Sequence, residues 1–169
     1  MQTGDHGGPI FTYPFSAGAL STGGSVDLWC VTGSTSTRYA VREIRIGQYS
    51  EAGDAQAEML PITFFSGSTA PSSATAITGL NINRYSTAVA PQATCTVAGP
   101  STVIASTASA ALILADSFNV AGGFHYYPVP AERYILGLSQ RFVVRVGSAN
   151  DAVTLNGTLM LQELGQTPQ

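Results

Sequence analysis

Short runs in which apolar and polar residues alternate follow one another along this chain, and Gly, Ser, Pro and Asn separate them. In residues 153–163, VTLNGTLMLQE, large apolar residues occupy odd-numbered positions and polar residues occupy most of the even-numbered ones. Residues 141–146, RFVVRV, also alternate, with Arg141 and Arg145 on the polar side. Successive side chains of a strand point to opposite faces of a sheet, so this period of two predicts half-buried strands.

The same pattern predicts further strands at 26–31, 39–48, 59–66, 93–98, 111–118, 125–129 and 133–138. The run 39–48 changes phase between Val41 and Ile44, which predicts a β-bulge. Pro61 cannot donate a ladder hydrogen bond, so it predicts that residues 59–66 lie at a sheet edge or that Pro61 lies near the strand start. Asn156 and Gly157 could form a hairpin turn, but their short flanks favour one long strand with a glycine notch.

Helix signals are few. The alanine-rich residues 101–116 give the best one, but β-branched residues weaken it, and the later part, ALILAD, can equally form a buried strand. Residues 66–91 predict a long loop or insertion. Short strands spaced by about 8–12 residues, with turn residues between them, predict an all-β fold, namely an antiparallel β-sandwich (jelly roll) over residues 17–165.

The chain is poor in charge. Only 10% of its 169 residues are charged, and all seven basic residues are arginine. Such a surface gains little solubility from net charge, which is expected if a partner covers much of it. The alternative is that Ser and Thr side chains keep a small β surface hydrated.

Composition also argues against several classes of function. A net charge of −3 argues against nucleic-acid binding, which depends on dense Lys and Arg. No run approaches the roughly 18 apolar residues of a membrane span, and residues 1–10 lack the features of a secretory signal. Cys30 and Cys95 lie far apart without metal-ligand spacing, so we expect two buried free thiols, or one disulfide if the chain functions outside a reducing cell.

The sequence offers little for catalysis. His6 lies in a Gly-rich stretch, whereas His125 lies between aromatic residues on an expected strand, where we expect a packed or rim residue. An enzyme using His125 would need an acid to hold the ring and a serine facing it. Asp116 and Asp151 lie at strand ends and form no recognisable acid–base pair or metal loop. We therefore expect no enzyme activity and no catalytic, metal or cofactor-binding site.

Aromatic residues are concentrated in IFTYPF near the start and in FHYYPVP, residues 124–130. The first group lies in residues 1–16, which we expect to form an N-terminal arm that contacts a partner protein or a sister subunit, and residues 166–169 would form a C-terminal tail. Alternatively, the rings cap the ends of the sandwich, or the tyrosines stack on a sugar. The residues expected at protein interfaces are Phe11, Tyr13, Phe15, Tyr126, Tyr127 and Arg133.

Residues 117–165 contain an aromatic–Pro stretch, a Glu-Arg pair, a glycine, an alternating strand and a closing strand that ends in Glu-Leu-Gly. This order resembles the C-terminal half of small jelly-roll proteins of tailed-bacteriophage virions, particularly capsid decoration (cement) proteins. Residues 27–48, DLWCVTGSTSTRYAVREIRIGQ, are similar to the early strand pair of that group. Together the two stretches cover 71 of the 169 residues, about two fifths of the chain.

The resemblance implies a non-enzymatic virion structural protein that decorates a phage capsid and stabilises it by bridging major capsid protein subunits. Such a protein is made in the host cytoplasm, lies on the capsid exterior and assembles as a homo-oligomer, often a homotrimer. The alternative is a carbohydrate- or receptor-binding jelly-roll module of a phage tail or fibre.

Overall fold

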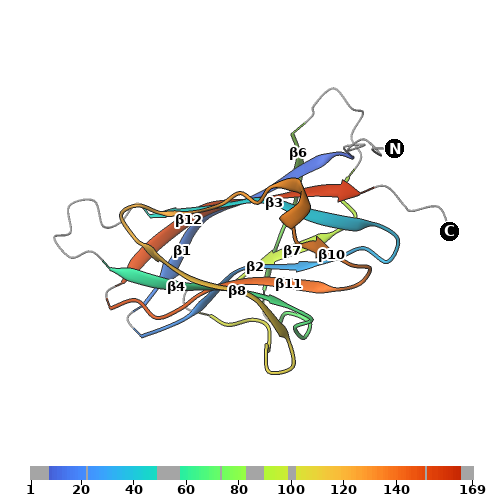
Figure 1. Cartoon of the computed structure of the whole chain (residues 1–169). Helices are drawn as coiled ribbons and strands as arrows, with labels where there is room; N and C mark the ends of the chain where they lie inside the picture. The colour runs from blue at the N-terminus through green and yellow to red at the C-terminus, as the bar shows by residue number, and fades with distance from the viewer. Residues whose placement is uncertain are drawn as a thin grey trace.

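The chain folds into two antiparallel sheets that pack face to face (Figure 1). The computed structural model describes residues 8–21, 23–48, 58–72, 74–82, 90–98, 102–150 and 152–164. Sheet I consists of β9 (Phe124–Tyr126) and β10 (Ile135–Leu136) along one edge of β3 (Arg38–Gln48), followed by β12 (Val153–Leu164), β1 (Ile10–Leu20) and β6 (Leu80–Asn81). Sheet II consists of β5 (Thr75–Ile77), β7 (Thr94–Val97), β2 (Val26–Thr32), β11 (Arg141–Val146), β4 (Met59–Ser66) and β8 (Ala111–Asn119). The predicted all-β sandwich is confirmed.

The strand order is that of a jelly roll. The neighbours β1, β12, β3 and β9 in sheet I, and β2, β11, β4 and β8 in sheet II, follow the double Greek-key order. The connection between β4 and β8 supplies the additional strands β5, β6 and β7. Residues 66–91 are therefore not one long loop, because β5 and β6 lie within them and extend the edges of the two sheets.

The main core lies between the sheets, and one glycine makes room in it. Val153, Leu155 and Leu159 of β12 are buried, as the alternation predicts. The rings of Phe15 and Trp29 pack edge to face with centroids 4.8 Å apart. A Cβ atom on Gly157 would lie 2.9 Å from atoms of both rings, so only glycine fits there without displacing them. Gly157 lies inside one long strand, as expected.

The structure corrects the expected N-terminal arm. Residues 10–16 belong to β1, which pairs with β12 and β6 inside sheet I. Phe11 and Tyr13 are fully buried, and the Trp29 Nε1 group donates a hydrogen bond of 3.0 Å to the Tyr13 carbonyl oxygen. The arm expected over residues 1–16 is therefore wrong for residues 10–16, which belong to strand β1 and place Phe11 and Tyr13 in the core. Residues 1–7 and the tail 166–169 lie outside the described residues.

Other elements agree with the expected pattern or refine it. The β3–β12 register shifts between Met160 and Leu161, so the predicted bulge is confirmed. Pro61 is the third residue of β4, which lies between β11 and β8, so it marks a strand start and not an edge. The segment ALILAD forms a strand, which is one of the two alternatives, but it is not buried: Leu114 packs half-buried against the main core and the other five residues are exposed.

Residues 102–107 cover part of the outer face of sheet II. Asp27 of β2 is fully buried beneath them, and its Oδ2 atom accepts hydrogen bonds from the amides of Ile104 at 2.9 Å and Ala105 at 3.1 Å. The Arg145 Nε atom lies 2.6 Å from Asp27 Oδ1, and Arg145 Nη2 donates to the Ala105 carbonyl oxygen at 2.8 Å. This ion pair therefore fixes the covering segment to the sheet.

The two cysteines lie on opposite faces of sheet II. Cys30 packs with Ile104, Ala105 and Val143 in a small outer cluster, whereas Cys95 lies in the main core. Both are free and buried, as expected. Since the sheet separates them, a disulfide between them would require rebuilding of this part of the fold.

Candidate protein-interaction surface

One edge of sheet I is interrupted by residues 127–134, which we call the edge loop. β9 and β10 both pair with β3, and the register leaves these eight residues opposite residues 41–43. The edge loop contains a 3-10 turn, η1 (Pro130–Glu132), drawn as an orange coil beside β3 in Figure 1. Pro128 and Pro130 lack amide donors, which suits a chain that leaves a sheet edge. The edge loop therefore presents side chains beyond the sheet.

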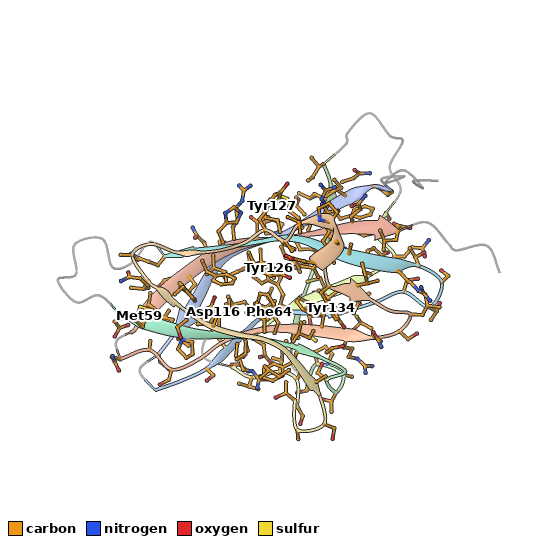
Figure 2. The ribbon with its side chains drawn as sticks, in the orientation of Figure 1. Met59, Phe64, Asp116, Tyr126, Tyr127 and Tyr134 are labelled. Atoms are coloured by element: carbon orange, nitrogen blue, oxygen red, sulfur yellow. The ribbon has the colours of Figure 1, made fainter. Side chains whose placement is uncertain are left out.

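Apolar side chains are exposed along this loop and the strand that follows. The Tyr127 side chain is 62% exposed, and Val129, Ile135 and Leu138 are exposed too. Tyr127 lies on the outer side of sheet I, whereas Tyr126 points between the sheets (Figure 2). We call Tyr127, Val129, Ile135 and Leu138 the apolar rim. Apolar side chains gathered on one edge indicate a contact surface more strongly than the same residues scattered singly.

A charged cluster adjoins the apolar rim on the outer face of sheet I. The Glu43 carboxylate is buried, and its Oε1 atom accepts hydrogen bonds from Arg45 Nε and, at 2.7 Å, from His125 Nε2. Burial alone would raise the pKa of Glu43, but the hydrogen bonds from Arg45 and His125 outweigh it and lower the pKa. The His125 and Tyr127 ring centroids lie 6.0 Å apart. Glu43 therefore fixes the exposed Arg45 and His125 side chains beside Tyr127.

Two further arginines tie the edge loop to the sheet. Arg42 Nη1 and Arg133 Nη1 both donate to Gln162 Oε1, at 3.2 Å and 3.4 Å. Gln162 is buried, and the buried Arg133 Nε atom has no hydrogen-bond partner among the residues that the structure describes. Two guanidinium groups share one neutral acceptor, so this region has donors to spare for a carboxylate brought by another protein.

An open groove of about 490 Å³ lies on the same sheet between β1, β3 and β12. Arg45, Asn156 and Thr158 line it, together with Gly47 and Gly157, which bear no side chains. A Cβ atom on Gly47 would lie 3.1 Å from Asn156 Oδ1, so a side chain there would crowd the groove. The groove offers hydrogen-bonding groups to a small polar ligand, but Tyr127 does not line it.

The structure separates the residues predicted to form interfaces. Phe11 and Tyr13 are core residues, so they do not contact partners in the folded protein. Phe15 is half-buried against Trp29, and Tyr126 is half-buried with its ring 5.2 Å from the Phe64 ring. Arg133 is half-buried and bonded to Gln162. Among these residues, only Tyr127 is exposed on the surface.

Several surface residues were missed by sequence reasoning. Val129 lies between two prolines, and this could have predicted its exposure. Prolines keep the segment extended at the sheet edge, where an apolar side chain is not readily buried in the core. Ile135 and Leu138 carry no such signal. Glu43 and Arg45 lie two residues apart beyond the bulge, so alternation with the buried Ile44 and Ile46 already places both on the outer face, and this was the available signal.

The Glu43–His125 pair could orient an imidazole for acid–base chemistry, but the surroundings do not form a triad. The ring contacts described here are the Glu43 carboxylate and the Tyr127 ring, and the imidazole lies on an open face. His6 lies outside the described residues. Within the described part of the chain, no group of three or more His, Cys, Asp or Glu could hold a metal ion, and no helix is long and apolar enough to cross a membrane.

Known proteins offer no further guide to this surface. A scan against protein-family models, a search of curated proteins and a search of solved structures each found no match.

Proposed function

We propose that this chain is a non-enzymatic virion structural protein that decorates a phage capsid and stabilises it by bridging major capsid protein subunits. Each bound copy would add contact area across a seam between subunits and would favour the assembled lattice by mass action. The jelly-roll topology and the resemblance of residues 27–48 and 117–165 to decoration proteins are consistent with this role.

The observation that carries the proposal is that the apolar rim lies beside arginine side chains on the same face. Interfaces are enriched in aromatic residues and arginine and depleted in lysine, and this face combines Tyr127, Arg45 and Arg133 in a chain without lysine. The edge loop is held by Arg133 and Gln162, so less conformational freedom is lost when a partner binds it.

Binding to undecorated capsids of the phage that encodes the chain tests the proposal. We expect a Tyr127→Ala/Val129→Ser variant to lower occupancy by about tenfold or more, since central aromatic anchors of interfaces contribute most to affinity. The matched control is Val103→Ser, which removes an exposed apolar side chain from the segment after residue 101, on sheet II. Wild-type protein that fails to bind the capsids, or equal occupancy for the rim variant and the control, would contradict the proposal.

The groove beside Arg45 favours a second candidate, a carbohydrate-binding module of a tail or fibre. Asn156 and Arg45 would then hydrogen-bond sugar hydroxyl groups. Glycan-array binding that Asn156→Ala abolishes and Tyr127→Ala leaves intact would support this candidate over decoration. Tyr126→Ala is a poor test because Tyr126 packs against Phe64 in the core.

A further inference from the structure

The outer face of sheet I carries positive charge, although the net charge of the chain is −3. Arg45 alternates with two buried isoleucines of β3, so it points away from the core. Gln162 also points outward, because it follows a core residue of β12, and Arg42 and Arg133 both contact it on that face. Within the described chain, the ion pairs on this face are those that Glu43 makes with Arg45 and with a histidine. Two arginines of this face are therefore not matched by a carboxylate of the described residues.

Arg42 and Arg133 share one neutral acceptor. Their Nη1 atoms lie 3.2 Å and 3.4 Å from the same atom, Gln162 Oε1. An amide oxygen has two lone pairs and no net charge, so it accepts these two hydrogen bonds without compensating the two positive charges. Each guanidinium group has five N–H donors, and Gln162 is the acceptor that each has within the described part of the chain. Like charges held at one neutral atom repel each other, which favours binding of an anion between them.

The nearest acids along the chain do not neutralise this pair. Glu163 follows Gln162 in β12, and the pleat of the strand turns its side chain toward the opposite face. Burial first, and then the Glu163 charge, raise the pKa of the core residue Tyr39, so Glu163 lies on the inner side of the sheet. Glu132 is exposed in η1, and no ion pair of the described residues joins it to Arg133. An acid that pairs with the two arginines must therefore come from outside the described residues.

Burial strengthens the interaction that such an acid would make. Gln162 is 1% exposed, and the Arg133 Nε atom is buried without a hydrogen-bond partner among the described residues. Partly buried guanidinium groups attract an anion more strongly than exposed ones, because the local dielectric constant is lower. Arg141 on sheet II also has a buried Nε atom, but no second arginine of the described chain contacts its acceptor, the Ser68 carbonyl oxygen. The convergence of two guanidinium groups therefore distinguishes the site on sheet I.

The surroundings favour a protein carboxylate over a nucleic-acid phosphate. Guanidinium groups bind both kinds of anion through pairs of N–H donors. Nucleic-acid binding depends on many cations along a backbone, whereas here two arginines converge in a chain without lysine. Arg133 also belongs to the edge loop, which carries Tyr127 and Val129 of the apolar rim. A partner protein can cover the rim with apolar side chains and bring an acidic side chain to the arginines, since interfaces combine an apolar centre with polar contacts.

We propose that Arg42 and Arg133 form a carboxylate-binding site, and that the partner of the apolar rim places an Asp or Glu side chain on it. The carboxylate accepts hydrogen bonds from both guanidinium groups and compensates their charge. The identity of the partner rests on the proposed function, but the chemistry of the site belongs to the free chain and is tested on it.

The Gln162→Glu variant tests the site from within, because it replaces the shared amide with a carboxylate of the same shape. We expect the midpoint of thermal unfolding at pH 7 to rise by about 2–4 °C. The two arginines lower the pKa of the introduced carboxyl, so the gain is complete above its ordinary pKa and disappears as the pH falls through the lowered value. The matched control is Gln140→Glu, at an exposed side chain that accepts from the Gly137 amide, and its midpoint should change by less than about 1 °C. An unchanged or lower midpoint for Gln162→Glu would overturn the inference.

Titration of the free chain with hexaglutamate at low ionic strength, followed by calorimetry, tests binding from outside. We expect Arg42→Gln to weaken binding by about tenfold or more, and Gln162→Glu to abolish it because its own carboxylate occupies the site. The matched control Arg141→Gln removes the same charge from a half-buried arginine of sheet II, and it should weaken binding by less than about threefold. A wild-type chain that does not bind, equal losses in Arg42→Gln and the control, or tighter binding of an oligothymidylate of the same charge would each overturn the inference.

Capsids enter only a third experiment, so the inference and the proposed function can fail separately. A chain that passes the first two tests but does not bind capsids keeps its carboxylate site and loses the proposed function. Where the wild type decorates capsids, Gln162→Glu should lower occupancy by about tenfold or more. Undiminished occupancy would contradict the placement of a partner carboxylate on this site.

Discussion

Two acid–arginine pairs lie on the outer faces of the two sheets, and they differ in what covers them. Asp27 pairs with Arg145 on sheet II, where residues 102–107 leave the Asp27 side chain 0% exposed and the Arg145 side chain 17% exposed. Glu43 pairs with Arg45 on sheet I, where Glu43 is buried but the Arg45 side chain is 61% exposed. The two acid–arginine pairs are therefore chemically similar, but one is covered by the chain and the other is open to solvent.

The difference follows from the partners of each carboxylate. Asp27 accepts hydrogen bonds from two backbone amides as well as from Arg145, so it holds a segment of chain in place. Glu43 accepts hydrogen bonds only from side chains, those of Arg45 and His125, among the described contacts. The first pair contributes to the fold, whereas the second orients exposed groups beside the apolar rim, where a partner can reach them.

The largest effect on stability is expected when the buried Asp27–Arg145 ion pair is broken. Asp27→Asn should lower the free energy of unfolding by about 3–5 kcal/mol, because Arg145 would keep a buried charge without its counter-charge. Denaturant unfolding monitored by circular dichroism measures the loss. The double variant Asp27→Asn/Arg145→Met should recover part of it, and a single variant as stable as the wild type would show that the pair does not anchor residues 102–107.

A thiol reports the same anchor locally. Burial, followed by the Asp27 charge, raises the pKa of Cys30 to about 11, so native Cys30 should react slowly with a thiol reagent at pH 8. Asp27→Asn loosens the cover and removes the charge, and we expect modification of Cys30 to become faster by about tenfold or more. Single-thiol variants, Cys95→Ser and Cys30→Ser, separate the two sites. If Asp27→Asn accelerated modification only of Cys95, which lies in the main core, the claim that Asp27 holds the cover over Cys30 would be contradicted.

The smallest effect on stability is expected from a change in the solvent-open Glu43–Arg45 pair. The pKa of Glu43 is lowered in the folded state, so its contribution to stability is complete above its ordinary pKa and disappears as the pH falls through the lowered value. Glu43→Gln should therefore reduce stability at pH 7 by less than about a third of the Asp27→Asn loss, since one partner is exposed. Below the lowered pKa, where Glu43 is protonated, the variant and the wild type should converge. Thermal unfolding across pH measures this, and a gap that widens toward acid would contradict it.

Much of the fold could be predicted because most strands have one buried face. In β12 and β11, alternation identified both the strands and their inward residues. It failed for β1, where three alternating aromatic residues at the chain start were interpreted as an exposed arm although Phe11 and Tyr13 fill the core. An alternating apolar strand shows which residues share a face, but not whether that face is covered.

The surface was harder to predict for the same reason. Arg145 was expected on the polar face of β11, and it is there, but residues 102–107 pack over it. Asp27 lies within the apolar run VDLWCV, and a lone acid in such a run is the available signal of a buried anchor. Adjacent tyrosines are separated by the pleat, which turns Tyr126 inward and Tyr127 outward.

The most direct measurement of the central claim is the copy number and position of this protein in purified phage particles, by quantitative mass spectrometry together with electron cryomicroscopy. We expect hundreds of copies on the outside of the head, with Tyr127 and Val129 against the major capsid protein. Particles that lack the protein, or that carry a handful of copies at the tail, would contradict capsid decoration.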